Sequence, residues 1–258
     1  MSEFLLEIEH LSKAFGALVA TDDVTLGIRK GETHALIGPN GAGKTTLVGQ
    51  LTGELTPDAG RIIFDGRDIT GLATAQRARL GLARSFQITS IFGSFTAEGN
   101  VALAVQATEP HSFRFWRPAE RIARLREPAR KLLADVGLGR VGRLLASRMS
   151  HGQHRQLELG MALATHPVML LLDEPMAGLG IEESRAMSKL LASIKGRYTI
   201  LLIEHDMDVV FSLADRISVL VGGRLVASGT AEEIRNDPGV RVAYLGAEDL
   251  AGELDVDR

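Results

Sequence analysis

The sequence predicts an α/β fold with a mostly parallel sheet, a small antiparallel β-subdomain and an inserted α-helical subdomain. Residues 33–37, 168–172 and 199–203 are nearly continuous in apolar character, as strands buried on both faces of a sheet are. Each of these runs leads into a segment with a helical pattern. Alternating strands and helices of this kind are typical of a parallel sheet with helices on its faces.

The N-terminal part carries a different strand pattern. Val24, Leu26 and Ile28 alternate with polar or small residues, and residues 61–64 form a short apolar run that ends in a turn. Alternation of this kind is typical of an antiparallel sheet with one face in solvent. Two further strands are expected at residues 5–8 and 217–221.

Residues from about 90 to 158 lack strand-like runs and show an arginine-rich helical pattern around residues 119–136. Because proline disrupts a helix interior, we expect Pro128 in the first turn of a second helix, which ends at Gly137. This part of the chain is therefore predicted to be the helical insertion. Thr230 and Glu233 have the spacing of a capping box and predict the start of a last helix.

Length and composition exclude several classes of protein. The 258 residues suffice for one large α/β domain. With 29 Lys and Arg against 32 Asp and Glu, the net charge is −3, without the basic excess of proteins that bind nucleic-acid backbones. The absence of cysteine excludes disulfides and zinc-thiolate sites. No secretory signal or membrane-spanning run is found, so we expect a cytoplasmic, soluble or peripheral protein that does not bind nucleic acid.

The clearest functional motif follows the first parallel strand. It fits the phosphate-loop pattern G-x-x-x-x-G-K-[ST], with a strand before it and a helix after it. Glycines let backbone amides and the helix N-terminus approach phosphates closely. We expect Lys44 to reach the β- and γ-phosphates and Thr45 to ligate Mg²⁺. The expected nucleotide-binding residues of this P-loop NTPase motif are Gly38, Pro39, Asn40, Gly41, Ala42, Gly43, Lys44, Thr45 and Thr46.

Acidic residues follow the next buried strand. Asp173 and Glu174 come directly after residues 168–172, at a carboxyl end where ligands of open α/β sheets bind. Asp173 is expected to hold Mg²⁺ through water, and Glu174 to accept a proton from the water that attacks the γ-phosphate. His205 follows the third buried strand and is a candidate partner of the γ-phosphate, although a lone histidine is more often a surface or core residue.

A second anion site is expected at residue 150. Ser150 and Gln153 have capping-box spacing ahead of a helical run over residues 157–164. The exposed amide end of such a helix attracts anions. If the phosphate loop already holds the nucleotide, this end needs a second ligand or a second copy of the protein. Taken in isolation, the same segment is a plain helix cap.

In this order, the motifs resemble those of the ATP-binding subunits of ABC transporters, and the resemblance covers nearly the whole chain. It implies an ATPase with ATP and Mg²⁺ as cofactors. It implies that Phe15 stacks on adenine; the alternative is that Phe15 is a core residue. It also implies that Gln87 lies near Mg²⁺ and near the contact with the membrane partner. Ser150, Gly152 and Gln153 match the signature motif, which in this family completes the ATP site of the opposite subunit.

The resemblance also implies the remaining roles. The expected catalytic residues are Lys44, Gln87, Glu174 and His205, and the expected metal-site residues are Thr45, Gln87 and Asp173.

The same resemblance implies an organisation and a set of partners. Residues 1–258 form one nucleotide-binding domain, in which residues 1–89 and 159–240 are the ATPase core with the antiparallel part. Residues 90–158 are the helical subdomain with the signature motif, and residues 241–258 are the C-terminal tail. The acidic composition after Gly246 indicates that this end is frayed. The expected partners are transmembrane permease subunits, a second identical or paralogous ATP-binding subunit and, indirectly, a periplasmic or extracellular substrate-binding protein. The expected location is peripheral, on the cytoplasmic face of the bacterial inner membrane.

Two residues depart from the usual family pattern. His151 replaces the first of two signature glycines and places a titratable side chain near the phosphate-facing turn, and Gly180 stands where many relatives carry an aspartate. Both variants, with residues 15–20, 204–210 and 244–246, resemble the branched-chain amino acid and urea importer subgroup. We therefore expect an ATPase subunit that powers an ABC importer for branched-chain amino acids. The alternatives are import of urea or another amino acid, and a lipid or lipopolysaccharide exporter.

Other nucleotide-binding classes fit less well. A GTPase needs an N-K-x-D motif, and the sequence has no Asn-Lys pair. A DNA-repair or chromosome-structure ATPase needs long coiled-coil insertions or zinc cysteines, and neither is present. The basic-aromatic stretch 113–117 is expected to be a solvated loop rather than a docking segment.

Overall fold

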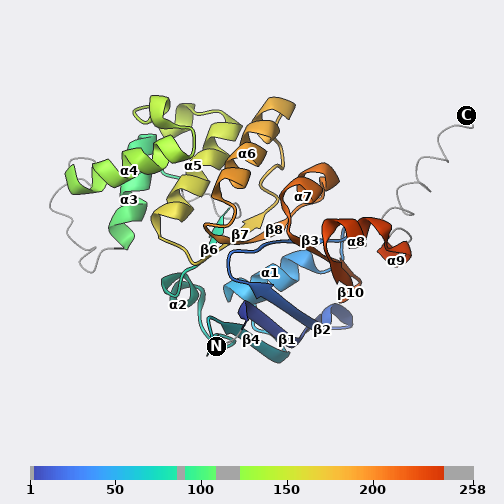
Figure 1. Cartoon of the computed structure of the whole chain (residues 1–258). Coiled ribbons are helices and arrows are strands. Elements are labelled where there is room, and N and C mark those ends of the chain that lie inside the picture. Colours follow the sequence, from blue (N-terminus) through green and yellow to red (C-terminus); the bar gives the residue numbers. More distant parts are fainter. Residues whose placement is uncertain (1–2, 86–90, 109–122, 241–258) are drawn as a thin grey trace, which may run out of the picture. The chain divides into compact units, whose positions relative to one another are not determined.

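The computed structural model describes residues 3–85, 91–108 and 123–240, and Figure 1 shows the course of the chain. Two compact units are formed, one by Met1–Arg79 with Lys195–Arg258 and the other by Leu80–Ile194. Gln87, residues 113–117 and the predicted tail lie outside the described residues. Among the residues described, no helix combines the length and the apolarity needed to cross a membrane.

An antiparallel sheet occupies the N-terminal part of the first unit. Its strands follow the order β2-β1-β4-β5. Val24, Leu26 and Ile28 on β2 are buried, while Thr25 between them is exposed and Gly27 is half-buried. The predicted alternation and the predicted antiparallel sheet are confirmed. The bounds are Phe4–Phe15 for β1, Leu18–Arg29 for β2, Ala59–Phe64 for β4 and Arg67–Asp68 for β5.

The parallel strands of the same unit pair around β3 (Thr33–Ile37). β3 is parallel to β8 (Thr199–Ile203) on one side and to β9 (Arg216–Val221) on the other. Every residue of β3 and β8 is buried, and both strands have the predicted bounds. β10 (Arg224–Gly229), which was not predicted, pairs antiparallel with β9. Its apolar run, residues 225–227, is only three residues long and is followed by Ser228 and Gly229.

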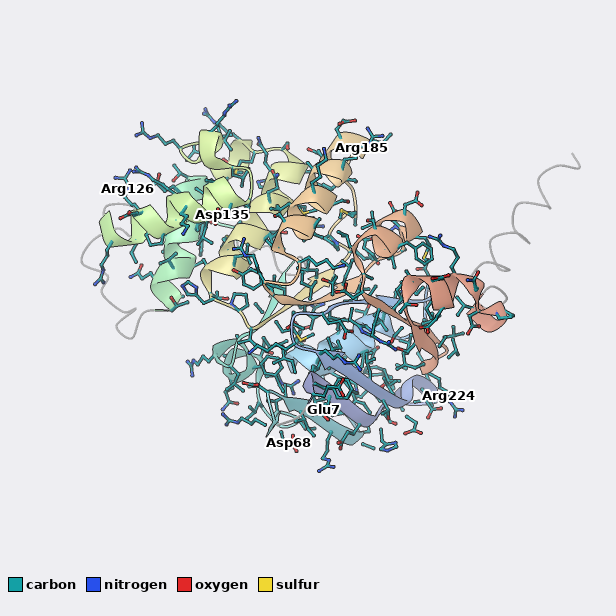
Figure 2. The ribbon with its side chains drawn as sticks, in the orientation of Figure 1. Glu7, Asp68, Arg126, Asp135, Arg185 and Arg224 are labelled. Atoms are coloured by element: carbon teal, nitrogen blue, oxygen red, sulfur yellow. The ribbon has the colours of Figure 1, made fainter. Side chains whose placement is uncertain are left out.

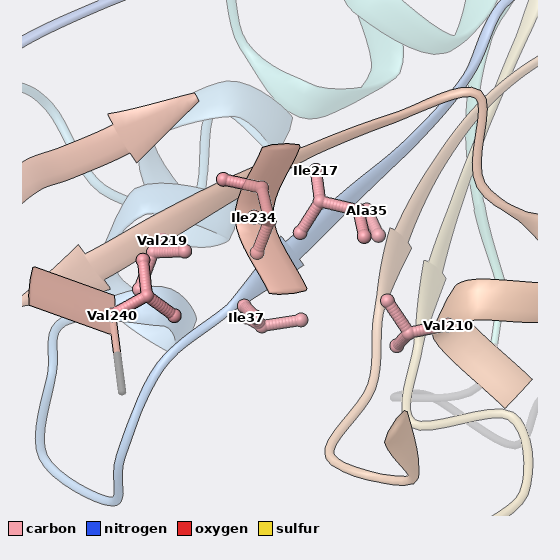
Figure 3. Close-up of a cluster of buried hydrophobic side chains, with 7 residues drawn as sticks. All are labelled: Ala35, Ile37, Val210, Ile217, Val219, Ile234 and Val240. Carbon is pink, nitrogen blue, oxygen red and sulfur yellow. The ribbon is translucent and has the colours of Figure 1, made fainter. Parts of the chain in front are cut away.

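One face of these strands is covered by short C-terminal helices. Figure 3 shows aliphatic side chains from β3 and β9 in a cluster with those of α7 (Met207–Leu213), α8 (Ala231–Asn236) and α9 (Pro238–Val240). The Thr230–Glu233 capping box that begins α8 is confirmed. The members of the cluster are Ala35, Ile37, Val210, Ile217, Val219, Ile234 and Val240.

Two further helices of the first unit are α1 (Lys44–Thr52) and α2 (Thr74–Arg79). A single buried arginine connects them, because the Arg77 guanidinium donates four hydrogen bonds to carbonyl oxygens. The acceptors belong to Gln50, Leu51, Thr70 and Leu72, at distances of 2.6 to 2.8 Å. The last carbonyls of α1 therefore have a fixed partner on α2.

The second unit combines a parallel strand pair with helices. β6 (Leu82–Ser85) is parallel to β7 (Met169–Asp173). β6 was not predicted, because Arg84 and Ser85 interrupt its apolar character. Short 3₁₀ turns at Gly139–Val141 and Ala146–Arg148 connect the helical part. The helices are α3 (Ala97–Ala107), α4 (Ala123–Asp135), α5 (His151–Ala164) and α6 (Ile181–Ile194).

Helix α4 corrects one prediction. It continues through Pro128, so the predicted helix start at this residue is wrong. Leu125, Ala129 and Leu133, at intervals of four residues, are 0 to 1% exposed. Burial of this row stabilises the continuous helix and outweighs the cost of the proline, which removes the amide that would bond to the Arg124 carbonyl and crowds that carbonyl with its ring.

Ion pairs tie helices of the second unit together. Arg126, labelled on α4 in Figure 2, donates to Glu98 of α3 at 2.6 Å, and Arg130 donates to the same carboxylate at 3.1 Å. Burial raises the pKa of Glu98, but the hydrogen bonds and charges of the two arginines outweigh it and hold the pKa below its usual value. The ionised form of Glu98 therefore stabilises the contact of α3 with α4.

Candidate functional site

The phosphate loop lies between β3 and α1 and is shaped by its glycines. Gly38 has φ +157° and Gly43 has φ +102°. A Cβ at Gly38 would lie 2.1 Å from the Leu220 carbonyl oxygen, and one at Gly43 would lie 2.0 Å from that of Ala20. Neighbouring backbone from β9 and β2 thus leaves room only for glycine at both positions.

The end of this loop carries two kinds of hydrogen-bond donor, the Lys44 ammonium and the backbone amides at the start of α1. The Lys44 ammonium donates to the carbonyl oxygens of Gly38 at 2.6 Å and Pro39 at 3.1 Å, so its charge lies over the loop. Gly43 at the N-cap of α1 supplies no side-chain cap, and Thr45 in the first turn is exposed. The amides and positive dipole end of α1 are arranged as in an anion-binding helix start.

Phe15 lies at the end of β1 and is 47% exposed, so the alternative that it is a core residue is wrong. The Lys13 ammonium is 5.7 Å from the centre of its ring. Asp58 accepts hydrogen bonds from the Lys13 ammonium at 2.7 Å and from the Ala14 amide at 2.8 Å. These bonds hold the pKa of Asp58 below its usual value. The ionised carboxylate therefore fixes the two residues that precede Phe15.

His205 follows β8, as predicted, and is not a core residue. Its side chain is 64% exposed, and its Nδ1 lies 3.7 Å from the buried carboxylate of Glu204. The next residue, Asp206, caps α7 by accepting from the amides of Asp208 and Val209. The start of α7 thus holds the backbone at His205 and leaves the imidazole accessible.

In the second unit, Asp173 ends β7. Its carboxylate accepts a hydrogen bond of 2.9 Å from the Arg84 guanidinium on β6, and both side chains are largely buried. This pair could not be predicted from the sequence, because its members are 89 residues apart. The pairing of β6 with β7 brings them together.

Glu174, the next residue, is exposed and has φ +49°. This left-handed conformation is uncommon for a residue with a side chain, and such strain is concentrated at functional sites. The Ala177 amide donates to the Glu174 carbonyl at 3.1 Å, which closes a turn directly behind the residue. The carboxylate is therefore carried on a strained turn at the end of a buried strand.

The predicted capping box at the start of α5 is confirmed, because Ser150 and Gln153 each bond to the other's backbone amide. A third residue, which was not predicted from the sequence, also contacts this turn. Glu183 of α6 accepts from the Ser150 hydroxyl at 3.0 Å and from the Gly152 amide at 3.3 Å. Its position as third residue of a helix is a capping-box signal, but nothing in the sequence indicates a contact with residue 150.

The two departures from the usual pattern both lie at the loop that follows Glu174. The His151 imidazole approaches the Ala177 carbonyl at 3.4 Å, so the ring lies against this loop. The Gly180 amide donates to Glu183 at 3.5 Å. A Cβ at Gly180 would meet no atom within 4 Å, so no steric contact within the chain requires glycine there.

Two of the residues predicted to hold Mg²⁺, Thr45 and Asp173, lie in the described part of the chain. In the part of the chain that the structure describes, no group of three or more His, Asp or Glu residues is arranged as a metal site. Thr45 and Asp173 offer a hydroxyl and a carboxylate, the hard oxygen ligands that Mg²⁺ takes. Mg²⁺ commonly uses one or two such ligands, with phosphate oxygens and water in the other positions.

A glycine-shaped phosphate loop between a buried parallel strand and a helix, with its lysine over the loop, defines a P-loop nucleotide-binding protein. The family described as ABC transporter matches residues 21–177. The chain belongs to this family and, as a cassette of it, is an ATPase. A second family, described as branched-chain amino acid ATP-binding cassette transporter, matches residues 224–249.

Curated relatives match over nearly their whole length. The branched-chain amino acid transport ATP-binding protein LivG of Salmonella typhimurium is 40% identical, over 95% of this chain and 99% of the relative. BraF of Pseudomonas aeruginosa, named for the same transport, is 39% identical over the same shares. The lipopolysaccharide export ATP-binding protein LptB of Acidithiobacillus ferridurans is 36% identical, over 95% of this chain and 98% of the relative.

Solved structures agree with the fold. An ATP-binding cassette of an ABC transporter in its ADP conformation has a TM-score of 0.84 and 31% identity, over 95% of this chain and 100% of the other. A nucleotide-free cassette has a TM-score of 0.81 and 32% identity, over 93% and 98%. The predicted P-loop α/β fold is thereby confirmed.

Proposed function

We propose that this chain is the ATP-hydrolysing subunit of an importer for branched-chain amino acids. The observation that carries the proposal is the phosphate loop, in which Gly38 and Gly43 fit against neighbouring backbone and Lys44 lies over the loop. The substrate class is supported by the match over residues 224–249 and by the names of LivG and BraF, which are 39 to 40% identical.

In the proposed reaction, the loop amides and Lys44 bind the β- and γ-phosphates. Phe15 offers an exposed ring for the adenine. Glu174 accepts a proton from the water that attacks the γ-phosphorus, while His205 donates a hydrogen bond to a γ-phosphate oxygen. Gln87 is proposed to act near the same phosphate. Thr45 and, through water, Asp173 would hold Mg²⁺, which would supply positive charge to neutralise the β- and γ-phosphates.

The signature turn, residues 150–153 at the start of α5, is proposed to act on the ATP of a second, identical or paralogous subunit. The start of α5 carries the positive end of the helix dipole at Ser150 and Gly152, where it would attract a phosphate. Two subunits then close over two ATP molecules, because only the closed dimer makes both sets of phosphate contacts. Hydrolysis removes this difference in affinity and reopens the dimer.

The remaining partners follow from the same proposal. Residues 90–158 form the helical subdomain that transmits the movement to transmembrane permease subunits, and residues 1–89 with 159–240 form the ATPase core. A substrate-binding protein outside the membrane delivers the amino acid. The chain is proposed to be peripheral, on the cytoplasmic face of the bacterial inner membrane.

Lipopolysaccharide export is a second candidate, because LptB is 36% identical over 95% of the chain. It has less support, since the relatives of 39 to 40% identity and the match near the C-terminus both name branched-chain amino acids. The permease subunits that co-purify from the native membrane separate the two. ATPase activity of the reconstituted complex should rise with a binding protein loaded with leucine, and stimulation by lipopolysaccharide alone would favour the second candidate.

The nucleotide site itself is tested by Lys44→Ala, with Lys30→Ala as the control, because Lys30 is exposed and lies before β3. We expect Lys44→Ala to lower the ATPase rate by at least about a hundredfold, since the charge over the loop is lost. Lys30→Ala should keep the wild-type rate. An unchanged rate in Lys44→Ala would contradict the phosphate-loop assignment.

A further inference from the structure

Glu183 places a negative charge on the donors of the signature turn. Its Oε1 accepts from the Ser150 hydroxyl at 3.0 Å and from the Gly152 amide at 3.3 Å, and its Oε2 accepts from the Gly180 amide at 3.5 Å. A Cβ at residue 152 would lie 2.6 Å from the Glu183 carboxyl group. The carboxylate therefore lies directly against the start of α5.

The direction of the Gly152 N–H is fixed by the helix, so any acceptor of this donor takes the place of Glu183 Oε1. A phosphate oxygen bound to Gly152 and Ser150 would then lie where the carboxylate oxygen now lies. If the carboxylate stayed close by, two anions would share the same donors at short range, which strongly disfavours binding. Phosphate and carboxylate are thus alternative occupants of one position.

We propose that Glu183 is a positioning residue that occupies the phosphate site of the signature turn and is displaced when the ATP of the second subunit arrives. This inference rests on the proposed function, because that function supplies the phosphate. Displacement also removes the Glu183 acceptor from the Gly180 amide, at the end of the loop that follows Glu174. Arrival of the phosphate on one turn is thereby coupled to release of the loop behind Glu174.

Neighbouring Glu182 provides a matched control. Both glutamates lie in the first turn of α6, so both interact with the same helix dipole. The Glu182 carboxylate is 85% exposed and pairs with Arg185 at 2.7 Å. Glu182→Gln therefore removes the same charge from the same helix without touching residues 150–152.

The test compares Glu183→Gln with Glu182→Gln in a Glu174→Gln background, in which hydrolysis is expected to be very slow. Sedimentation measures the ATP concentration at which half of the protein is dimeric. We expect Glu183→Gln to lower this concentration about tenfold, because a competing charge is removed from the phosphate position. Glu182→Gln should change it by less than about twofold.

A second readout separates this role from helix capping. With Glu174 intact, Glu183→Gln should lower KM for ATP while kcat stays within about twofold, because the change acts on binding. If Glu183 only capped α6, Glu183→Gln would instead lower the melting temperature and leave KM unchanged or raised. That pattern would overturn the inference.

The outcomes also distinguish this inference from the function on which it rests. If Glu174→Gln dimerises with ATP, and adding Glu183→Gln or Glu182→Gln leaves the required ATP concentration equal, the role of Glu183 is overturned. The proposed function then still stands. A complete lack of ATP-driven dimerisation in all forms overturns the proposed function, and the role of Glu183 with it.

Discussion

Single side chains connect parts of this chain that are far apart in sequence. Asp58 binds Lys13 and the Ala14 amide from 45 and 44 residues away and so fixes the strand end that carries Phe15. Glu183 accepts a hydrogen bond from the Ser150 hydroxyl, although the two residues are 33 positions apart in the sequence. Neither contact has a local sequence signal, which is why the motifs could be predicted from the sequence but these supporting residues could not.

The role of Asp58 is tested by Asp58→Ala, Phe15→Ala and the double variant. Phe15→Ala should raise KM for ATP roughly tenfold through loss of stacking on the base, and Asp58→Ala roughly threefold by releasing the strand end. Because Asp58 acts through Phe15, the double variant should match Phe15→Ala alone. Effects that multiply in steady-state kinetics would show that Asp58 acts independently of the ring.

The buried guanidinium of Arg77 is expected to contribute to the free energy of unfolding. It is 2% exposed and supplies hydrogen bonds to four carbonyl oxygens. Arg77→Met should lower the free energy of unfolding by about 3 kcal/mol, because these acceptors lose their partner in a buried place. Arg79→Met, at an exposed position of the same helix, should change it by less than about 0.5 kcal/mol. Urea unfolding measures both, and equal losses would contradict the account.

In helix α4, the hydrogen bond lost at Pro128 is opposed by the packing of the helix's buried side chains. Pro128 lacks the amide that would bond to the Arg124 carbonyl, yet the helix passes through it. Pro128→Ala restores this bond and should raise the free energy of unfolding by roughly 1 kcal/mol, after allowance for the greater freedom of the unfolded chain. A lower melting temperature in this variant would show that the proline shapes the helix for packing.

The contact of α3 with α4 should depend on pH. The pKa of Glu98 is lowered in the folded protein, so its ionised form contributes stability that is fully present above the ordinary carboxyl pKa. This contribution is lost as the pH falls through the lowered pKa. The difference in unfolding free energy between wild type and Glu98→Gln should therefore shrink steadily below about pH 4.5. A constant difference down to pH 3 would contradict this assignment.

The accuracy of the sequence predictions varied with the kind of element. β3 and β8 were predicted to the residue, because their continuous apolar runs are buried on both faces. β6 and β10 escaped prediction, since arginine and serine interrupt their apolar pattern. Cap positions at Ser150 and Thr230 were correct because a capping box is a local interaction. The Pro128 error arose because burial across α3, α4 and α5 is not local.

For the molecule as a whole, the residues proposed to act on ATP come from both compact units. Lys44 and His205 belong to one unit, and Asp173, Glu174 and the signature turn at Ser150 belong to the other. The proposed function assigns the signature turn to the ATP of a second copy. Under this proposal, a single chain would carry every type of catalytic group but only part of each complete site.

The most direct test of this central claim is the ATPase rate per subunit of the purified wild-type chain, measured across protein concentrations that bracket the monomer–dimer transition. The rate per subunit should rise with protein concentration and level off as the dimer forms, with Ser150→Ala reducing the plateau because the turn loses a phosphate donor. A strictly monomeric preparation that hydrolyses ATP at the full rate, independent of protein concentration, would contradict the claim.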